Sequence, residues 1–509
     1  MIKRFLTLFL LLFLVFCSNC TNRQPDSEKI RMFVNDLESK SKQAIPADLF
    51  LQWEMYVDNG EDFSGPAAIP AANILNDHSL LDKLRILRKS TGDETTLREL
   101  EILERDIIIA ITETHPEIKA LKDTLRELCR RIHEVNAMPN EIQESIPDIG
   151  EGIARLFRLR NLVAKDLGYK SYYSLRMYID NYDLRFSEKL ITALDMATSG
   201  PYAILLEKLN VKDSLDLGEL FRRLATFHQI DLEYDAYFPS EDHIELLDKA
   251  LLTIGFDLDK LPIYFNLPST PVRGEGAATF AIQVPYDIRI VVHPNDGYRA
   301  FRQLLRESAI ALYYSHIGEN DFLYKTAPSA CLIKAINKLI ESLILNTPWL
   351  KTVMPLSDEL TGGMNLYLTD STIINVRAMI VSAELEKELY QNPYLDPRRL
   401  FDSLFSKIMK SHPLGGKDYL NFLAGHIDQP LNALDNFIAE GIVAQCLYYL
   451  NNAENNPDDS LSPKDFMVQY LFSHGRKYDW NDILKKATGE TLNIKYYIDR
   501  LSPDSLYPE

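Results

Sequence analysis

The sequence is poor in the side chains that most metal and redox sites need. It has 10 His and 5 Cys in 509 residues. No two His stand four residues apart, which is the spacing at which a helix presents two imidazoles to one zinc ion. His133 and Glu134 begin that pattern, but Ala137 stands where the second His is required. The ordinary zinc-hydrolase helix is therefore absent.

Paired cysteines are also missing. Beyond residue 20 the chain has only Cys129, Cys331 and Cys446, which are far apart and stand among apolar residues. No Cys-x-x-Cys occurs. We therefore expect buried free thiols rather than a disulfide framework or a redox centre.

Other catalytic signatures and excess positive charge are lacking as well. The sequence has no Gly-x-Ser-x-Gly, no glycine-rich loop ending in Lys-Ser or Lys-Thr, and no calcium loop. Its 55 Lys and Arg face 73 Asp and Glu, a net charge of -18. Nucleic acid is excluded as a partner, because no basic excess is available to neutralise phosphates. By themselves, the residues show no active site.

The longest apolar run stands at the N-terminus. Two basic residues precede Phe5–Phe16, a pattern typical of an export signal and shorter than a membrane-spanning helix. We expect residues 1–20 to be a lipoprotein-type signal and 21–29 a tether. Cys20 is a better candidate than Cys17 for the lipidated residue, and plain secretion is the alternative. The protein is then expected at the bacterial cell envelope, attached to the membrane through a lipid only.

Most of the remaining chain repeats apolar residues at intervals of three and four, which predicts packed amphipathic helices and a mainly α protein. One stretch differs. Thr279–Val284 and Ile288–Val292 are β-rich runs separated by a proline turn, and they predict a hairpin. After a short loop, Arg302–Ile317 predicts a buried helix that contains two adjacent charges, Arg306 and Glu307.

The order of hairpin, loop and buried helix resembles the zinc-helix region of the angiotensin-converting-enzyme and oligopeptidase group of zinc peptidases. Residues 274–290, with Pro285-Tyr286-Asp287-Ile288-Arg289, are similar to the segment that precedes the zinc helix. Leu304–Tyr313 then follows the frame Leu-Leu-His-Glu-x-Gly-His-x-x-Tyr.

Further stretches resemble the same group in the same order. They are Arg160–Tyr169, Arg377–Pro393, His426–Gln445 and Ala487–Asn493. The resemblance covers residues 30–505. It implies a single mainly α domain. The implied fold is that of a two-lobed zincin-like peptidase, with a central cleft and a small β-hairpin beside the zinc-helix equivalent.

The positions of the zinc ligands have changed. The two His of the group fall on Arg306 and Ile310, a gapless alignment places the third ligand on Lys334, and only the general base remains, as Glu307. Arginine and isoleucine offer no lone pair, and a lysine repels a dication. The resemblance therefore implies a pseudoenzyme without zinc or any other cofactor.

The C-terminal motif departs from the group too. Its substrate-binding and oxyanion-binding tyrosines fall in the stretch 432–436, which includes Ala433 and Asn436. We therefore expect no phenol to face the cleft.

The charges on the buried helix still need partners, because an unpaired buried carboxylate is strongly unfavourable. We expect Lys334 to enter the space of the missing metal and pair with Glu307. Arg306 would lie beside them or turn outward to another acid. The alternative is that Arg306 and Glu307 pair loosely on a hydrated cleft floor.

Without the metal, the substrate groove can persist. In the group a peptide lies as an added strand beside the hairpin, so Ala278, Phe280 and Ile282 form the candidate peptide-binding edge. We therefore expect an inactive homologue of a zinc oligopeptidase or peptidyl-dipeptidase. It would bind peptides, or it would act as a scaffold that binds a protein partner at the cell envelope.

The alternative is an active peptidase or other hydrolase. It would use Glu307 with an atypical metal site or with none, assisted by Tyr313, Tyr314, His316 or His426.

Overall fold

The structure is a computed structural model, and it describes residues 27–59, 71–134, 139–211, 213–228, 235, 237–266, 277–292, 295–353, 358–414, 416–452 and 461–501. The expected signal segment, with Cys17 and Cys20, lies outside the described residues.

Helices make up most of the described chain, as the apolar spacing predicts. Their bounds are α2 (Ser27–Asn59), α3 (Ala72–Leu75), α4 (His78–Arg88), α5 (Glu94–Glu113), α6 (Pro116–Glu134), α7 (Pro139–Asp166), α8 (Tyr172–Ile179), α9 (Leu184–Lys208), α10 (Leu217–Phe227), α11 (His243–Thr253), α12 (Tyr298–Ser315), α13 (Ala330–Ile344), α14 (Thr347–Val353), α15 (Asp358–Gln391), α16 (Pro397–Met409), α17 (Lys417–Asp428), α18 (Asn432–Asn451), α19 (Pro463–Phe466), α20 (Trp480–Thr488) and α21 (Lys495–Arg500).

Several helices begin where the sequence supplies a side-chain cap. Asp93 accepts a hydrogen bond from the backbone N–H of Thr96 at the start of α5. Asp183 does the same for α9 through Phe186 N–H. Such caps satisfy donors that the first helical turn leaves free.

The strands form two small sheets. β1 (Ser214–Leu215) pairs in parallel with β5 (His412–Pro413). In the second sheet the order is β2 (Ile263–Asn266), β4 (Asp287–Val292), β3 (Ala277–Gln283). β3 and β4 are antiparallel, so the predicted hairpin is confirmed.

β3 lies between two helices. Phe280 and Ile282 are buried against α2, while Thr279, on the opposite face of the strand, bonds to α12. Alternate side chains of a strand point to opposite faces, and here both faces are covered. β4 pairs with one edge of β3, and no strand of the described sheet pairs with its other edge.

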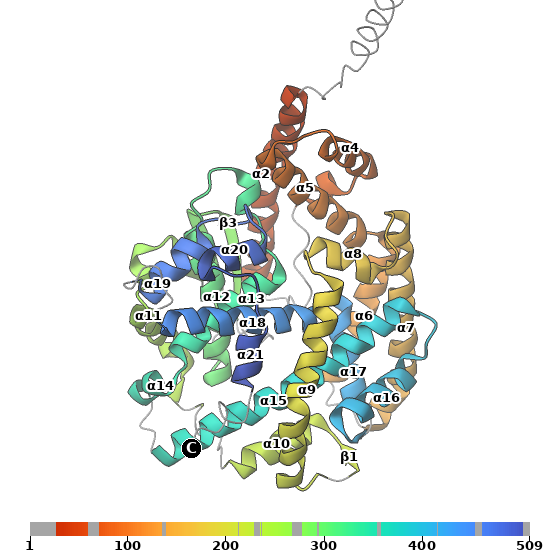
Figure 1. Ribbon diagram of the computed structural model, residues 1–509, viewed down its shortest axis with the longest axis vertical. Coiled ribbons are helices and arrows are strands. Elements are labelled where there is room, and N and C mark those ends of the chain that lie inside the picture. The colour runs from red at the N-terminus through yellow and green to blue at the C-terminus, as the bar shows by residue number, and fades with distance from the viewer. Residues whose placement is uncertain are drawn as a thin grey trace, which may run out of the picture.

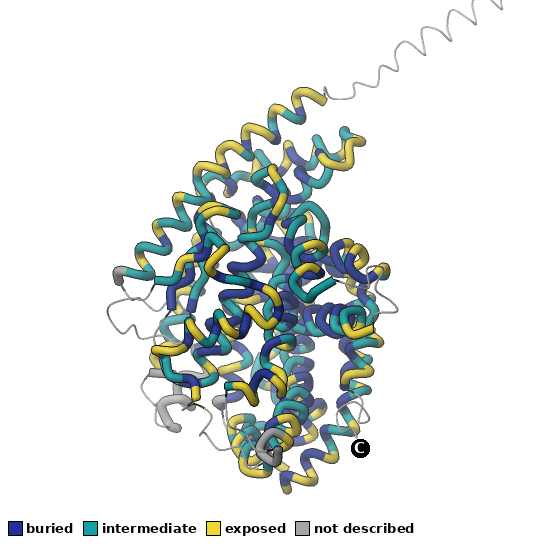
Figure 2. The backbone as a smooth tube through the Cα atoms, turned by 90° about the vertical axis from the view of Figure 1, so that its left-hand side faces the viewer, coloured by how far each residue is buried: buried dark blue, intermediate teal, exposed yellow. Residues whose placement is uncertain are grey.

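The helices form two groups around a shared core (Figure 1). One group surrounds α12, α13 and β3, and the other contains α6, α7, α16 and α17. α18 packs on α13 and also contacts α15, which packs on α16. Buried residues concentrate in the interior of the molecule, whereas α2 exposes one side along much of its length (Figure 2).

The cysteine expectation is confirmed for pairing and partly for burial. None of the three described cysteines forms a disulfide; Cys331 and Cys446 are buried, and Cys129 is half-buried. Within the described part of the chain, none of the helices is both long and apolar enough to cross a membrane.

Candidate functional site

The altered peptidase positions lie on three neighbouring helices. α12 contains Arg306, Glu307 and Ile310, α13 contains Lys334, and α18 begins with the stretch 432–436. α12 packs on α13, and α13 packs on α18. Residues from three separate segments of the sequence therefore meet in one region.

Arg306 is paired with an acid from the neighbouring helix. Its Nε donates to Glu341 Oε2 at 3.0 Å, and Arg302, one turn earlier on α12, also pairs with Glu341. The Arg306 side chain remains 39% exposed. The expectation that Arg306 turns to another acid is confirmed, and a loose pair with Glu307 is not formed.

Lys334 does not pair with Glu307, so this expectation is wrong. Its Nζ donates to Asn432 Oδ1 at 2.5 Å and to Asp435 Oδ2 at 3.1 Å. The reason lies in the packing: Lys334 meets α18, where Asn432 and Asp435 are three residues apart and share one face. The cation at the third-ligand position thus bonds to the altered C-terminal motif.

Asp435 is the buried member of this pair. Its side chain is 5% exposed, and its Oδ1 accepts a hydrogen bond of 2.6 Å from the Tyr182 hydroxyl. Burial raises the pKa of Asp435, while Lys334 and the Tyr182 hydrogen bond oppose that shift. The carboxylate therefore depends on these two partners to stay ionised.

Glu307 is held by the hairpin instead. Thr279 Oγ1 donates to Glu307 Oε2 at 2.8 Å and also contacts the Glu307 carbonyl oxygen at 2.9 Å. Gln303 Nε2 donates to the other carboxylate oxygen at 3.2 Å. Burial raises the pKa of Glu307 to about 7, although the Thr279 hydrogen bonds lower it. Glu307 can therefore gain or lose a proton near neutral pH.

The residues present do not fit a zinc ion. Arg306 and Lys334 are cations already neutralised by Glu341 and Asp435, and Ile310 has no donor atom. Among the residues that the structure describes, no group of three or more His, Cys, Asp or Glu is placed to hold a metal. No catalytic step through a metal follows from this site.

The former tyrosine positions are inside the helix packing. Ala433 is buried, and Asn436 Nδ2 donates to Asn432 O at 2.8 Å within α18. The expectation that these positions leave no phenol at the former metal region stays a prediction, and three other tyrosines, Tyr286, Tyr314 and Tyr478, line a cavity beside that region. These tyrosines come from other segments, and a gapless alignment of the C-terminal motif does not detect them.

A cavity of about 840 Å³ lies beside this region. It is lined by α2, α5, α8 and β3, by Tyr314 of α12, by the segment 320–332, which includes η4 (Phe322–Lys325), and by the loop 475–480. Of the predicted peptide-binding edge, Ile282 lines the cavity together with Thr279, Ala281 and Gln283. Phe280 instead faces α2, and so does the partly buried Ala278.

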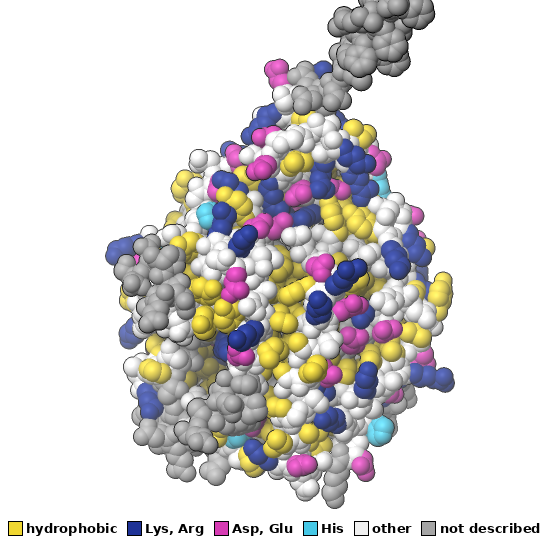
Figure 3. Space-filling view, in the orientation of Figure 1, with side chains coloured by type: hydrophobic (Ala, Val, Ile, Leu, Met, Phe, Trp, Pro, Cys, Tyr) yellow, Lys and Arg dark blue, Asp and Glu magenta, His cyan; other side chains and the backbone are white. Residues whose placement is uncertain are grey.

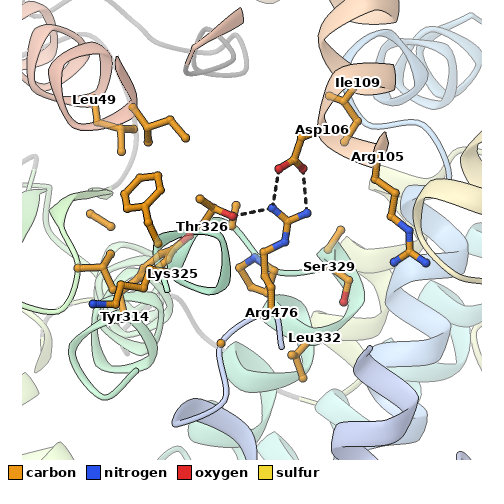
Figure 4. A pocket seen from close by; sticks show the side chains of 18 of the residues that line it. Leu49, Arg105, Asp106, Ile109, Tyr314, Lys325, Thr326, Ser329, Leu332 and Arg476 are labelled. Carbon is orange, nitrogen blue, oxygen red and sulfur yellow. Dashed lines mark hydrogen bonds and ion pairs between the residues drawn. The ribbon is translucent and has the colours of Figure 1, made fainter. Parts of the chain in front are cut away.

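Ion pairs connect opposite walls of the cavity. Arg476 lies between Asp106 and Thr326 (Figure 4): it donates to both carboxylate oxygens of Asp106, at 2.8 and 3.0 Å, and to Thr326 Oγ1 at 2.6 Å. Arg98 and Arg105 both donate to Asp479 Oδ1, at 2.9 and 2.8 Å.

The sequence gives only a weak signal for these residues. Arg98 and Arg105 are seven residues apart, so they share one face of α5. Nothing in the sequence places Asp479 or Arg476 against them, because about 370 residues separate the partners. This cationic lining is the feature of the region that the sequence does not reveal.

The four side chains that would assist Glu307 in an active enzyme, those of Tyr313, Tyr314, His316 and His426, do not gather around it. Tyr313 is buried with its hydroxyl unbonded, and His316 Nδ1 bonds within its own helix to Leu312 O. Tyr314 lines the cavity. His426 contacts Phe157 and the residues Ser382 and Glu386 of α15.

Ser382, His426 and Glu386 lie in the sequence of contacts found in a serine hydrolase triad. Ser382 Oγ lies 3.3 Å from His426 Nε2, and His426 Nδ1 lies 3.5 Å from Glu386 Oε2. Ser382, however, is in the interior of α15, where backbone N–H groups are used in helical hydrogen bonds and cannot serve an oxyanion. Ser382 also does not line the cavity. The arrangement therefore supports helix packing, with Glu386 accepting from Leu431 N–H.

Comparisons with known proteins give a fold but no sequence family. No protein-family model matches the chain, and no curated protein gives a significant match. Solved structures match over nearly the whole chain.

Three solved carboxypeptidases illustrate the match. Trypanosoma cruzi metallocarboxypeptidase 1 has 14% identity and a TM-score of 0.67 over 94% of this chain and 100% of its own. The M32 carboxypeptidase of Deinococcus radiodurans R1 has 14% identity and a TM-score of 0.64, over 94% and 99%. Pyrococcus furiosus carboxypeptidase has 15% identity and a TM-score of 0.64, over 92% and 98%.

These matches confirm the mainly α, two-lobed peptidase fold. They show a metallopeptidase-like fold. The narrower resemblance to the angiotensin-converting-enzyme and oligopeptidase group stays a prediction, because matches at 14% and 15% identity show the fold alone.

Proposed function

We propose that this protein is a catalytically inactive member of the metallopeptidase-like fold that binds peptides in its cleft. The observation behind the proposal is the state of the former ligand positions. Arg306 and Lys334 bring positive charge to the region where the motifs require metal ligands, and each is neutralised by a carboxylate of this chain. A dication would have to displace these pairs and would find no neutral donor in their place.

The cleft supports peptide binding through its strand. β3 is the last strand of the described sheet, and four of its residues line the cavity. An extended peptide can add to such an edge through main-chain hydrogen bonds, which do not depend on its sequence. The apolar lining from Ile45, Leu49 and Leu332 would accept alternate side chains of the peptide.

A second candidate function is favoured by Glu307. A half-buried carboxyl group with a pKa of about 7 is suited to general acid-base catalysis at neutral pH. Against this candidate, its polar partners are Thr279 and Gln303, neither of which activates a water molecule. Proton transfer by Glu307 alone would be slow.

The location is a further part of the proposal. We propose export to the bacterial cell envelope with a lipid on Cys20, on the basis of the apolar run Phe5–Phe16 followed by cysteine. An alkyne-labelled fatty acid should be incorporated into the wild-type protein and into Cys17→Ser, but not into Cys20→Ser. Labelling of Cys20→Ser would contradict the assignment.

One set of measurements tests the function. Purified protein should contain far less than one zinc atom per chain, should not cleave a mixture of fluorogenic peptides with or without added zinc, and should release heat when titrated with uncleaved peptides. Stoichiometric zinc or cleavage that disappears in Glu307→Gln would favour the enzyme. Absence of heat with every peptide would favour a scaffold that binds a folded protein.

A further inference from the structure

The cavity has a charge opposite to that of the whole protein. The chain has a net charge of -18, and Lys, Arg, Asp and Glu are mixed over the face of the molecule shown in Figure 3. Six cationic and three anionic side chains line the cavity. These are Lys42, Arg98, Arg105, Arg176, Lys325 and Arg476 against Asp106, Asp180 and Asp479. The excess of three positive charges is local to the cleft.

The three carboxylates are already engaged. Asp106 pairs with Arg476 through both oxygens. Asp180 pairs with Arg176 at 2.9 Å. Asp479 is shared by Arg98 and Arg105, and Arg98 also pairs with Glu101 of its own helix at 3.6 Å.

Two positive charges therefore remain without an ion pair among the described residues, those of Lys42 on α2 and Lys325 on η4. The pKa of Arg98 is lowered by burial and by the nearby Arg105 and Arg476, but Asp479 and Glu101 together neutralise Arg98 and Arg105.

This lining differs from that of the former metal region. Arg306 and Lys334 each meet a carboxylate of this chain, whereas the two lysines that line the cavity form no ion pair with a described residue. Uncompensated cations at the wall of a cleft raise its affinity for anionic groups and reject cationic ones.

We propose that the cleft selects acidic peptides, with Lys42 and Lys325 receiving aspartate or glutamate side chains. The inference rests on the proposed peptide-binding function and adds the class of peptide. Apolar residues stand among the cations in the lining, so the preferred segment combines acidic and apolar side chains.

Fluorescence anisotropy with defined peptides tests the inference. The probes are acetylated and C-terminally amidated peptides of alternating leucine and glutamate, with matched leucine–glutamine and leucine–lysine peptides. Blocking both ends removes the terminal charges, so only side chains differ. The glutamate peptide should bind at least about tenfold more tightly than the glutamine peptide, and the lysine peptide should bind most weakly.

Charge reversal at the cleft identifies the site. Lys325→Glu should weaken binding of the glutamate peptide about tenfold or more and leave binding of the glutamine peptide nearly unchanged. Lys189→Glu is the matched control, because Lys189 is an exposed residue of α9 and does not line the cavity. It makes the same change in net charge and should leave both affinities unchanged. Melting temperatures should show that both variants are folded.

The outcomes separate the two proposals. The acidic preference is wrong if the glutamate and glutamine peptides bind with equal affinity. It is also wrong if neither Lys325→Glu nor Lys42→Glu weakens binding of the glutamate peptide. In both cases the proposal of peptide binding still holds. If no peptide binds, peptide binding and acidic preference are both wrong.

Discussion

The former metal region and the neighbouring cavity both contain clustered cations, but they use them differently. Between α12, α13 and α18, Arg306 and Lys334 bond to acids of the chain itself. In the cavity, cations outnumber acids. A charge neutralised inside the protein supports its geometry, whereas a charge left without a counterion can act on a ligand. Substitutions in the first region should therefore change stability, and those in the second should change binding.

The largest expected effect is that of Lys334→Ala. It leaves Asp435 buried with Tyr182 as its remaining hydrogen-bond donor, and we expect the free energy of unfolding to fall by about 3 kcal/mol. Lys338→Ala is the matched control: Lys338 is one turn further along α13 and pairs with Glu440 of α18, with both side chains 26% exposed. That variant should lose about 0.5 kcal/mol. Urea denaturation measures both, and equal losses would contradict the role of Lys334 as counterion of the buried Asp435 carboxylate.

The next effect depends on pH and concerns Glu307. In the unfolded chain its carboxyl group ionises near 4.5, and in the folded protein near 7. Between these values the folded state binds the extra proton, so stability falls as the pH rises from 4.5 to about 7 and stays reduced above it. The difference between 4.5 and 7 corresponds to about 3 kcal/mol for a fully buried group. Because Glu307 is only half-buried, Glu307→Gln, which removes this penalty, should be more stable than wild type by about 1 to 2 kcal/mol at about pH 8.

At about pH 4 the same variant should match the wild type, because both folded and unfolded Glu307 are then protonated. Glu207→Gln, an exposed substitution on α9, should show no such pH dependence. A Glu307→Gln protein that is less stable than wild type at alkaline pH would mean that the carboxylate is stabilised by a group other than Thr279 and Gln303.

The fold could be predicted from the sequence because the patterns that specify it are local, or belong to motifs whose residues are buried and contact one another. The β-rich runs and the apolar spacing locate the hairpin and α12. The motifs found by resemblance also form contacts with one another: Arg160 donates to the carbonyl oxygens of His426 and Ile427, and Asn161 bonds to Tyr390 O. These contacts hold helices together without catalysis, so they can persist when the metal ligands change.

The partners within the site could not be predicted in the same way. A gapless alignment gives the position of Lys334, but not whether its side chain meets α12 or α18. The choice of Asp435 over Glu307 depends on how α13 is rotated in the packed structure. The cavity is further from prediction, because α5 and the loop 475–480 come together only in the folded chain.

A small effect is expected for Arg306→Ala. The Arg306 side chain is 39% exposed, and Glu341 keeps Arg302 as a partner. A partly exposed pair of this kind contributes about 0.5 kcal/mol, and its loss should diminish further at high salt. A loss as large as that of Lys334→Ala, measured by urea denaturation, would mean that Arg306 supports the region as strongly as Lys334 does.

The smallest expected effect is that of zinc on the wild-type protein. A ligand that binds only the folded state raises stability by RT ln(1 + [L]/Kd), about 4 kcal/mol at a concentration a thousandfold above Kd. We expect no such shift in melting temperature with zinc and none with a chelator. The double variant Arg306→His and Ile310→His is the positive control, since it places two imidazoles one turn apart on α12. Stabilisation of that variant by zinc, with no response of the wild type, would show that these two positions alone separate the present site from a metal-binding one. An equal response of both proteins would place the metal elsewhere and remove the basis of the comparison.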